Sequence, residues 1–308
     1  MSLKLNIDAY LEVPETAKEE TIEPPKQKGA LALLRELFTK PKPKPTKPPG
    51  DNHARTSPYS QEAVFAVLND FLQPESTKPL HQAVREILAL LPENAPESTE
   101  IWSAGDIIIE VASQIPYSHP SQLKLAQLVE QLISAEKFLD KSPSGDGMRY
   151  RGQRFKESLR DSVTGPNDEL LNEWPNLNAF YAHLDACHII PYTPAWAISA
   201  MWSAFEAEIE DPFPGEKDQC ILAAAQYIFW SGQELFKAIS YVSEDYTPGE
   251  PGPLYTGEGG LSLHRWRFWK DGFRAAGGDM GIGEEARGVA GKAAVLMEGL
   301  ESALVFDL

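Results

Sequence analysis

The sequence is poor in cysteine and lacks the features of a secreted or membrane-spanning chain. Its 308 residues contain two cysteines, Cys187 and Cys220, which are too few for a disulfide framework. The first twenty residues contain no apolar core of a signal peptide. Prolines interrupt the most apolar stretch, residues 186–205, which therefore predicts a buried helix rather than a membrane span. We expect a reducing, cytoplasmic location, with the nucleus left open, and no contact with a membrane.

Basic residues are scarce outside the first part of the chain. Residues 1–55 contain ten Lys and Arg against eight Asp and Glu. The formal net charge of −17 therefore leaves −19 on residues 56–308. Such a domain repels nucleic acid and anionic membranes, so we expect neither as a partner.

Proline is concentrated in residues 40–50, "KPKPKPTKPPG", which predicts an extended basic spacer. Residues 1–28 are polar and poor in core-forming side chains, which predicts disorder. Between them, residues 29–38 place apolar side chains at helical spacing. The predicted organisation is a disordered arm, residues 1–56, with a short amphipathic helix and a Lys/Pro spacer, followed by one α-helical domain, residues 57–308. The arm could dock on a partner, reach an acidic surface or fold back on its own domain.

From Ser57 onward the apolar spacing is helical, with little sustained alternation. "DIIIEV", residues 106–111, resembles a strand, but its flanks continue a helical stripe. No fixed internal period relates the seven tryptophans. The sequence therefore predicts an all-α fold, an irregular bundle of about ten helices. After two helices before residue 92, the others are expected at 98–115, 120–139, 149–162, 176–190, 194–210, 217–243, 262–276 and 283–305.

The stretch "RWRFWKDGF", residues 265–273, is the most aromatic part of the sequence. At 100° per residue, Trp266, Trp269 and Phe273 share one helical stripe, with Arg265 at its margin. This pattern favours a helix packed in the core, whose arginines pair with acidic helices or lie over rings. An exposed binding face that includes Arg265, Trp266 and Trp269 remains the alternative.

Three stretches near the C-terminus carry a resemblance to a known family. They are "CILAAAQYIFWSGQELFK" (220–237), "LHRWRFWKDGF" (263–273) and "EEARGVAGKAAVLMEGLE" (284–301). Together they resemble an uncharacterised family of filamentous-fungal proteins, a domain of unknown function, over about residues 60–305. The resemblance implies an α-helical intracellular protein of fungal origin, and it implies no catalytic residues.

Groups that could carry chemistry are few. In "HLDACH", His183 and Cys187 share one helical face, and Asp185 and His188 share another, so one metal could not easily gather all four. Side chains that close a helix end are the favoured interpretation. The acidic run "FEAEIED", residues 205–211, predicts a helix end exposed to solvent. Nucleophile-elbow, phosphate-loop and zinc-protease motifs are absent.

These observations favour a non-catalytic binding or scaffold protein that acts through helical surfaces and its N-terminal arm. We expect no cofactor, no metal and no catalytic residue, and a protein or an apolar small molecule as the partner. The alternative is an enzyme or small-molecule binder whose site lies between helices, around residues 183–188 and the Trp266 helix. The binding candidates are Arg265, Trp266, Trp269, His183 and His188.

Overall fold

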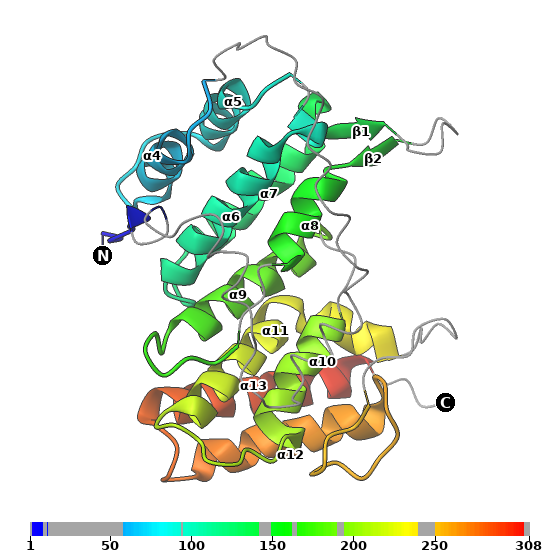
Figure 1. The fold of residues 1–308 in the computed structure, drawn as a ribbon. Helices are drawn as coiled ribbons and strands as arrows, with labels where there is room; N and C mark the ends of the chain where they lie inside the picture. Colours follow the sequence, from blue (N-terminus) through cyan, green and yellow to red (C-terminus); the bar gives the residue numbers. More distant parts are fainter. Residues whose placement is uncertain are drawn as a thin grey trace.

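The computed structural model describes residues 2–8, 11, 58–93, 95–141, 149–161, 165–189, 194–239 and 250–304. Its architecture is all-α, as the apolar spacing predicted, and the helices form an irregular bundle (Figure 1). The α-helices are α4 (Gln61–Leu72), α5 (Leu80–Leu90), α6 (Thr99–Gln114), α7 (Ser121–Ser134), α8 (Gln153–Asp161), α9 (Glu173–Ala186), α10 (Ala195–Met201), α11 (Glu216–Ala238), α12 (Leu263–Gly278) and α13 (Glu284–Leu304).

Two groups of helices meet at α9. Helices α4 to α8 pack together in the upper part of Figure 1, and α10 to α13 lie below them. Helix α9 packs against α6 and α7 on one side and against α11 on the other, and α11 packs in turn against α13. Every residue from Trp174 to Asp185 is buried, which is the physical reason that α9 shows no amphipathic pattern.

The "DIIIEV" segment is helical, as its flanks predicted. It lies within α6, where Ile107, Ile108 and Val111 are fully buried. Helix α6 packs against α4, α8 and α9, so it needs apolar side chains on more than one face. This explains three consecutive isoleucines in a helix, although β-branched residues favour strands.

A short hairpin departs from the expected pattern. Strands β1 (Leu139–Lys141) and β2 (Arg149–Arg151) pair antiparallel with each other. The helix expected from residue 149 therefore begins later, at Gln153. Three-residue strands are too short to produce a recognisable alternation.

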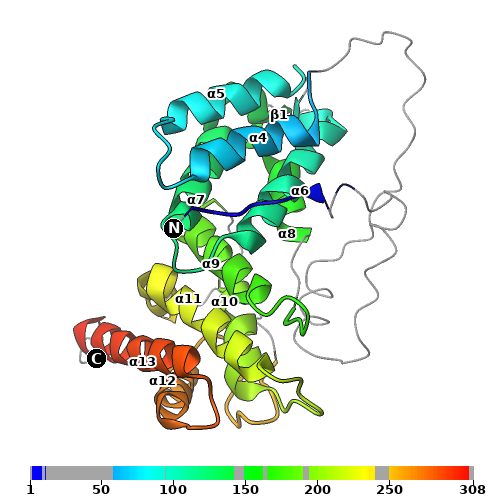
Figure 2. The ribbon, with the colours of Figure 1, turned by 90° about the vertical axis from the view of Figure 1, so that its left-hand side faces the viewer.

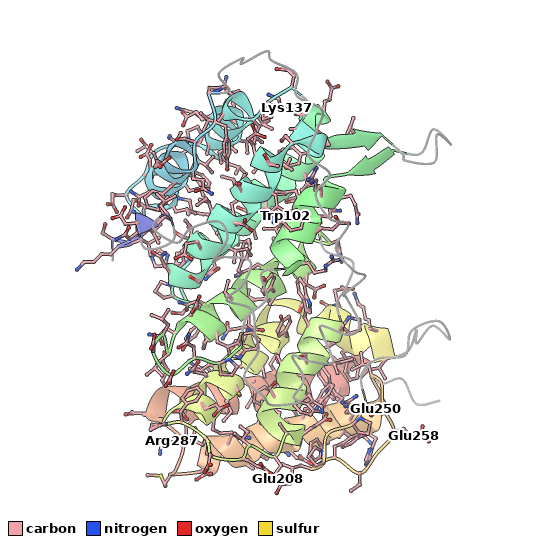
Figure 3. The ribbon with its side chains drawn as sticks, in the orientation of Figure 1. Trp102, Lys137, Glu208, Glu250, Glu258 and Arg287 are labelled. Atoms are coloured by element: carbon pink, nitrogen blue, oxygen red, sulfur yellow. The ribbon has the colours of Figure 1, made fainter. Side chains whose placement is uncertain are left out.

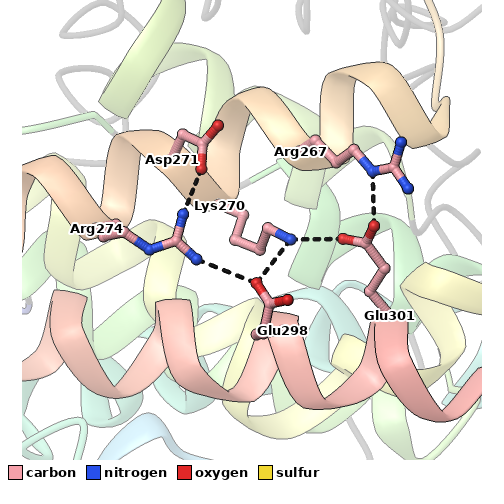
Figure 4. Close-up of polar contacts among 6 residues, drawn as sticks. All are labelled: Arg267, Lys270, Asp271, Arg274, Glu298 and Glu301. Atoms are coloured by element: carbon pink, nitrogen blue, oxygen red, sulfur yellow. Dashed lines mark hydrogen bonds and ion pairs between the residues drawn. The ribbon is translucent and has the colours of Figure 1, made fainter.

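Ion pairs connect α12 and α13 along their partly exposed seam (Figure 4). Lys270 Nζ lies 2.8 Å from Glu298 and 2.7 Å from Glu301. Arg267 pairs with Glu301 at 2.6 Å, and Arg274 pairs with Glu298 at 3.1 Å. Each exposed pair is worth little alone, but a ladder of them sets the register between the two helices.

The predicted amphipathic helix, residues 29–38, and the Lys/Pro spacer, residues 40–50, lie outside the described residues. Residues 2–8 belong to the stretch for which the composition predicted disorder, yet they are packed against the helices. Within the described part of the chain, no helix combines the length and the apolar character needed to span a membrane.

Candidate functional site

The aromatic residues of α12 are core residues. Trp266, Trp269 and Phe273 have no exposed surface, which confirms the core interpretation of "RWRFWKDGF". The Trp266 ring packs edge-on against Phe236 of α11, with centroids 4.9 Å apart. These side chains therefore do not form an exposed binding face.

Arg265 is buried as completely as the tryptophans, and it pairs with Glu206. Its Nε donates to Oε1 of Glu206 at 2.7 Å, and one terminal nitrogen donates to Oε2 at 2.8 Å. The other terminal nitrogen donates to the carbonyl of Gly260 at 2.9 Å. Two parallel bonds between a guanidinium and a carboxylate are the strong form of this pair.

The sequence interpretation of Glu206 as part of a solvated helix end is wrong. Residues Trp202–Glu206 form a π turn, and Glu206 has no exposed surface. A π turn directs side chains differently from the α-helical wheel used for the prediction. Two positions later Glu208 is exposed at the edge of the molecule (Figure 3), as expected for an acidic residue.

The Glu206 carboxylate has no capacity left for a ligand. Besides the two bonds from Arg265, it accepts one from Trp269 Nε1 at 2.6 Å and one from the Gly252 N–H at 2.9 Å. Two carboxylate oxygens accept about four hydrogen bonds in total. This cluster therefore holds the segment after residue 250 against α12, and it offers no open group for catalysis.

The "HLDACH" residues point in different directions. His183 is 3% exposed, and its ring lies 4.2 Å from that of Trp230 on α11. His188 is exposed, with φ of 54°, in the turn that follows α9. Asp185 is buried. Cys187 is partly buried, and its own burial raises the pKa of its thiol. Among the described residues, no group of three or more His, Cys, Asp or Glu could hold a metal ion.

The binding candidates from the sequence thus do not come together. His183 contacts Trp230 of α11, whereas Trp266 contacts Phe236, six positions further along the same helix. Burial lowers the pKa of the His183 imidazole to about 4, so this ring is neutral near pH 7. The His183 ring is tilted by 39° against the indole of Trp230, which is itself 44% exposed, so this is a packing contact at the edge of the core.

An arrangement suited to binding lies elsewhere, at the extended N-terminal segment, residues 2–7. Figure 2 shows this segment passing between α4 and α6. Its side chains alternate: Ile7 is 3% exposed and Leu3 and Leu5 are half-buried against the core, whereas Ser2, Lys4 and Asn6 are exposed. Period-two alternation is the pattern of a strand with one face buried.

Two glutamines hold the main chain of this segment. Oε1 of Gln73 accepts from the Leu3 N–H at 2.9 Å, and its Nε2 donates to the Leu3 carbonyl at 3.3 Å. Gln114 makes the same pair of bonds with Asn6, at 2.8 and 2.6 Å. We call these four bonds the glutamine clamp. Each glutamine satisfies both polar groups of one peptide residue, as a neighbouring strand would.

The two halves of the clamp are built alike. Gln73 follows the last residue of α4, and Gln114 is the last residue of α6. Each Nε2 also donates to an acceptor one turn back: Asn69 at 3.0 Å and Glu110 at 2.8 Å. A proline lies one or two residues beyond each glutamine, which ends the helix there.

The start of α7 holds both helix ends in place. Ser121 donates to the carbonyl of Leu72 at 2.5 Å, and Lys124 donates to that of Phe71 at 2.6 Å. Gln122 donates to the carbonyls at 112 and 115, at the end of α6, at 3.2 and 2.7 Å. These contacts satisfy orphan carbonyls of the two helices without involving the N-terminal segment. The distance between the clamping glutamines is therefore fixed by the domain itself.

The spacing of the clamped residues follows from strand geometry. In an extended chain, the N–H and C=O groups of successive residues point to opposite edges. Leu3 and Asn6 are three residues apart, so their polar groups face opposite edges, toward α4 and α6 respectively. The segment is thus held from both sides while its apolar face rests on the core.

Sequence reasoning missed this site because its signal is short. "LKLNI", residues 3–7, alternates apolar and polar side chains, but five residues carry little weight in a polar stretch. Glutamines at helix ends look like ordinary surface residues.

Comparison with known proteins finds a family and nothing beyond it. A family model described as "Protein of unknown function (DUF3632)" matches residues 106–273, which is more than half of the chain. The match includes Gln114, Glu206 and Arg265, and it leaves out α4 and residues 2–7. No curated protein matches the chain, and no solved structure matches it either.

Proposed function

We propose that this chain, which belongs to the DUF3632 family of proteins of unknown function, is a non-catalytic binding protein that holds an extended polypeptide segment between the ends of α4 and α6. The observation that carries the proposal is the glutamine clamp, in which two side chains bond both main-chain groups of Leu3 and of Asn6. Main-chain hydrogen bonds combined with pockets for alternate side chains are the physics of strand recognition.

The rigidity of the clamp supports binding rather than mere packing. Each glutamine is oriented by a residue one turn back, and α7 holds the two helix ends. A site whose groups stay in place without the ligand loses little conformational entropy on binding. We propose that the clamp persists when the segment leaves it.

The proposed partner is a protein, and the proposed location is the cytoplasm. The charge of −19 on residues 56–308 disfavours nucleic acid and anionic membranes. Both cysteines, Cys187 and Cys220, are free thiols, which suits a reducing compartment. An apolar small molecule is a less suitable ligand here, because the clamp presents polar groups at the spacing of a peptide.

The test is peptide binding to a full-length chain whose own segment is weakened. The Ile7→Glu substitution replaces the most deeply buried side chain of the segment with a charged one. The segment should then leave the clamp, which becomes free for a peptide. A labelled peptide with the sequence of residues 2–11, SLKLNIDAYL, is titrated against this variant by fluorescence polarisation. We expect saturable one-to-one binding, which Gln73→Met plus Gln114→Met abolishes. Gln82→Met on α5 is the matched control and should bind as Ile7→Glu alone does.

Hydrogen exchange on the unmodified full chain provides an independent measurement. The amide protons of Leu3 and Asn6 should be protected, and Gln73→Met plus Gln114→Met should remove that protection. Absence of peptide binding to a folded Ile7→Glu chain, or unprotected amides in the unmodified chain, would contradict the proposed function.

A further inference from the structure

We infer that residues 2–7 act as a tethered competitor for the clamp, and that the partner carries an extended segment with apolar side chains at three alternate positions. This inference rests on the proposed function and names its ligand and its regulation.

The three inward side chains define what the clamp selects. Leu3, Leu5 and Ile7 face the helices, and Ile7 is the most buried of them. The side chains between them are exposed, so their identity has little influence on binding. The selected pattern is therefore apolar, any, apolar, any, apolar, with the strictest requirement at the last position.

The main chain adds a second requirement. The first and fourth residues of the pattern must each supply an N–H, as Leu3 and Asn6 do at 2.9 and 2.8 Å. Proline lacks this group, so it is excluded from both positions. This requirement distinguishes clamp binding from general apolar adhesion, which needs no N–H.

The resident segment occupies the place that a partner would take. Residues 8–57, 50 in number, separate it from Pro58, where the described part of the domain begins. For a segment tethered to its own site, the effective concentration is on the order of 1 mM. A segment with a dissociation constant near 0.1 mM would then weaken the binding of a competing peptide about tenfold.

The first experiment measures the affinity of three full-length receptors for the labelled SLKLNIDAYL peptide. We expect the unmodified chain to bind it about tenfold more weakly than Ile7→Glu does. Leu3→Glu plus Leu5→Glu, which leaves Ile7 unchanged, serves as a second open receptor, so that a folding defect in one variant does not decide the result. Equal affinity for the unmodified and open chains would overturn the competition while leaving the proposed function intact. No affinity for either open chain would overturn both.

The second experiment tests the ligand pattern with peptide variants on the Ile7→Glu receptor. Asn6→Pro in the peptide should reduce affinity at least tenfold, whereas Asn6→Ala, which keeps the N–H, should bind nearly as the parent. Ile7→Glu in the peptide should abolish binding, and Lys4→Glu should not. Equal binding of the proline and alanine peptides would overturn recognition through the main chain.

The same competition could occur between two copies of the chain. Analytical ultracentrifugation of the unmodified chain at about 0.1 mM distinguishes the cases. We expect a monomer, because an effective concentration of about 1 mM favours the chain's own segment. A dimer that Ile7→Glu dissociates would show exchange of segments between copies and would overturn the intramolecular competition.

Discussion

Arg265 and Glu206, 59 positions apart in the sequence, form a bidentate ion pair from which solvent is completely excluded. The pair joins the π turn after α10 to the start of α12, and the Gly252 N–H and Gly260 carbonyl bind to it from the intervening segment. Each charge is acceptable in the core only because the other is present.

Removing one partner of this pair should strongly destabilise the fold. Arg265→Met leaves the Glu206 carboxylate buried and uncompensated, and we expect the free energy of unfolding to fall by about 3–5 kcal/mol. Glu206→Leu combined with Arg265→Met should cost less than the two single substitutions added together. Urea unfolding measures these differences. Glu208→Gln, at an exposed position, is the control and should change stability by less than about 0.5 kcal/mol.

The two buried tryptophans of α12 should respond differently to replacement by phenylalanine. Trp269 donates to Glu206, whereas the Trp266 Nε1 has no hydrogen-bond partner in the described part of the chain. Alanine at either position should cost roughly 3–5 kcal/mol, because both rings are fully buried. Trp269→Phe should cost about 1–3 kcal/mol more than Trp266→Phe, since it removes a bond to a charged group. Equal losses in thermal melts of the two variants would show that this bond contributes little.

Acid should weaken the fold through His183. Burial lowers the pKa of His183 from 6.5 to about 4, so the unfolded chain binds more protons between these values. The contribution to stability is complete above pH 6.5 and decreases as the pH falls toward 4, by roughly 3 kcal/mol at most. His183→Gln should reduce the difference between melting temperatures at pH 7.5 and pH 4.5. His81→Gln, at an exposed position, should leave that difference as it is in the unmodified chain.

Two glycine-to-alanine substitutions should have opposite effects. A Cβ on Gly252 would lie 2.5 Å from the Glu206 carbonyl oxygen, so Gly252→Ala must displace the segment from the ion pair. We expect a loss of about 1–3 kcal/mol. A Cβ on Gly288 of α13 would meet no atom within 4 Å, and Gly288→Ala should stabilise the helix by roughly 0.5–1 kcal/mol. Chemical denaturation of both variants gives the comparison.

Local periodicity was sufficient to predict the helices and their order. The apolar stripes identified α6 correctly despite "DIIIEV", and they placed Trp266, Trp269 and Phe273 in the core. The resemblance in residues 220–237 and 263–273 agrees with a family match that covers residues 106–273, whereas the third stretch, residues 284–301, lies beyond that match. These features depend on neighbours within one or two helical turns, and such neighbours are visible in the sequence.

Long-range pairing was beyond the reach of the same reasoning. Nothing near Glu206 in the sequence indicates that its partner lies 59 positions away, so a buried carboxylate resembled a surface one. Likewise, Gln73 and Gln114 acquire a role only because α7 places two helix ends on either side of residues 2–7.

The sequence by itself determined the all-α class, the acidic domain and the core position of the tryptophan helix, because short-range apolar spacing and composition suffice for these. Only the tertiary structure decided which polar side chains pair with each other in the core. It also decided that the extended segment, residues 2–7, is held between the ends of α4 and α6. Those outcomes depend on how helix ends distant in the sequence meet, and on the rule that buried polar groups must find partners there.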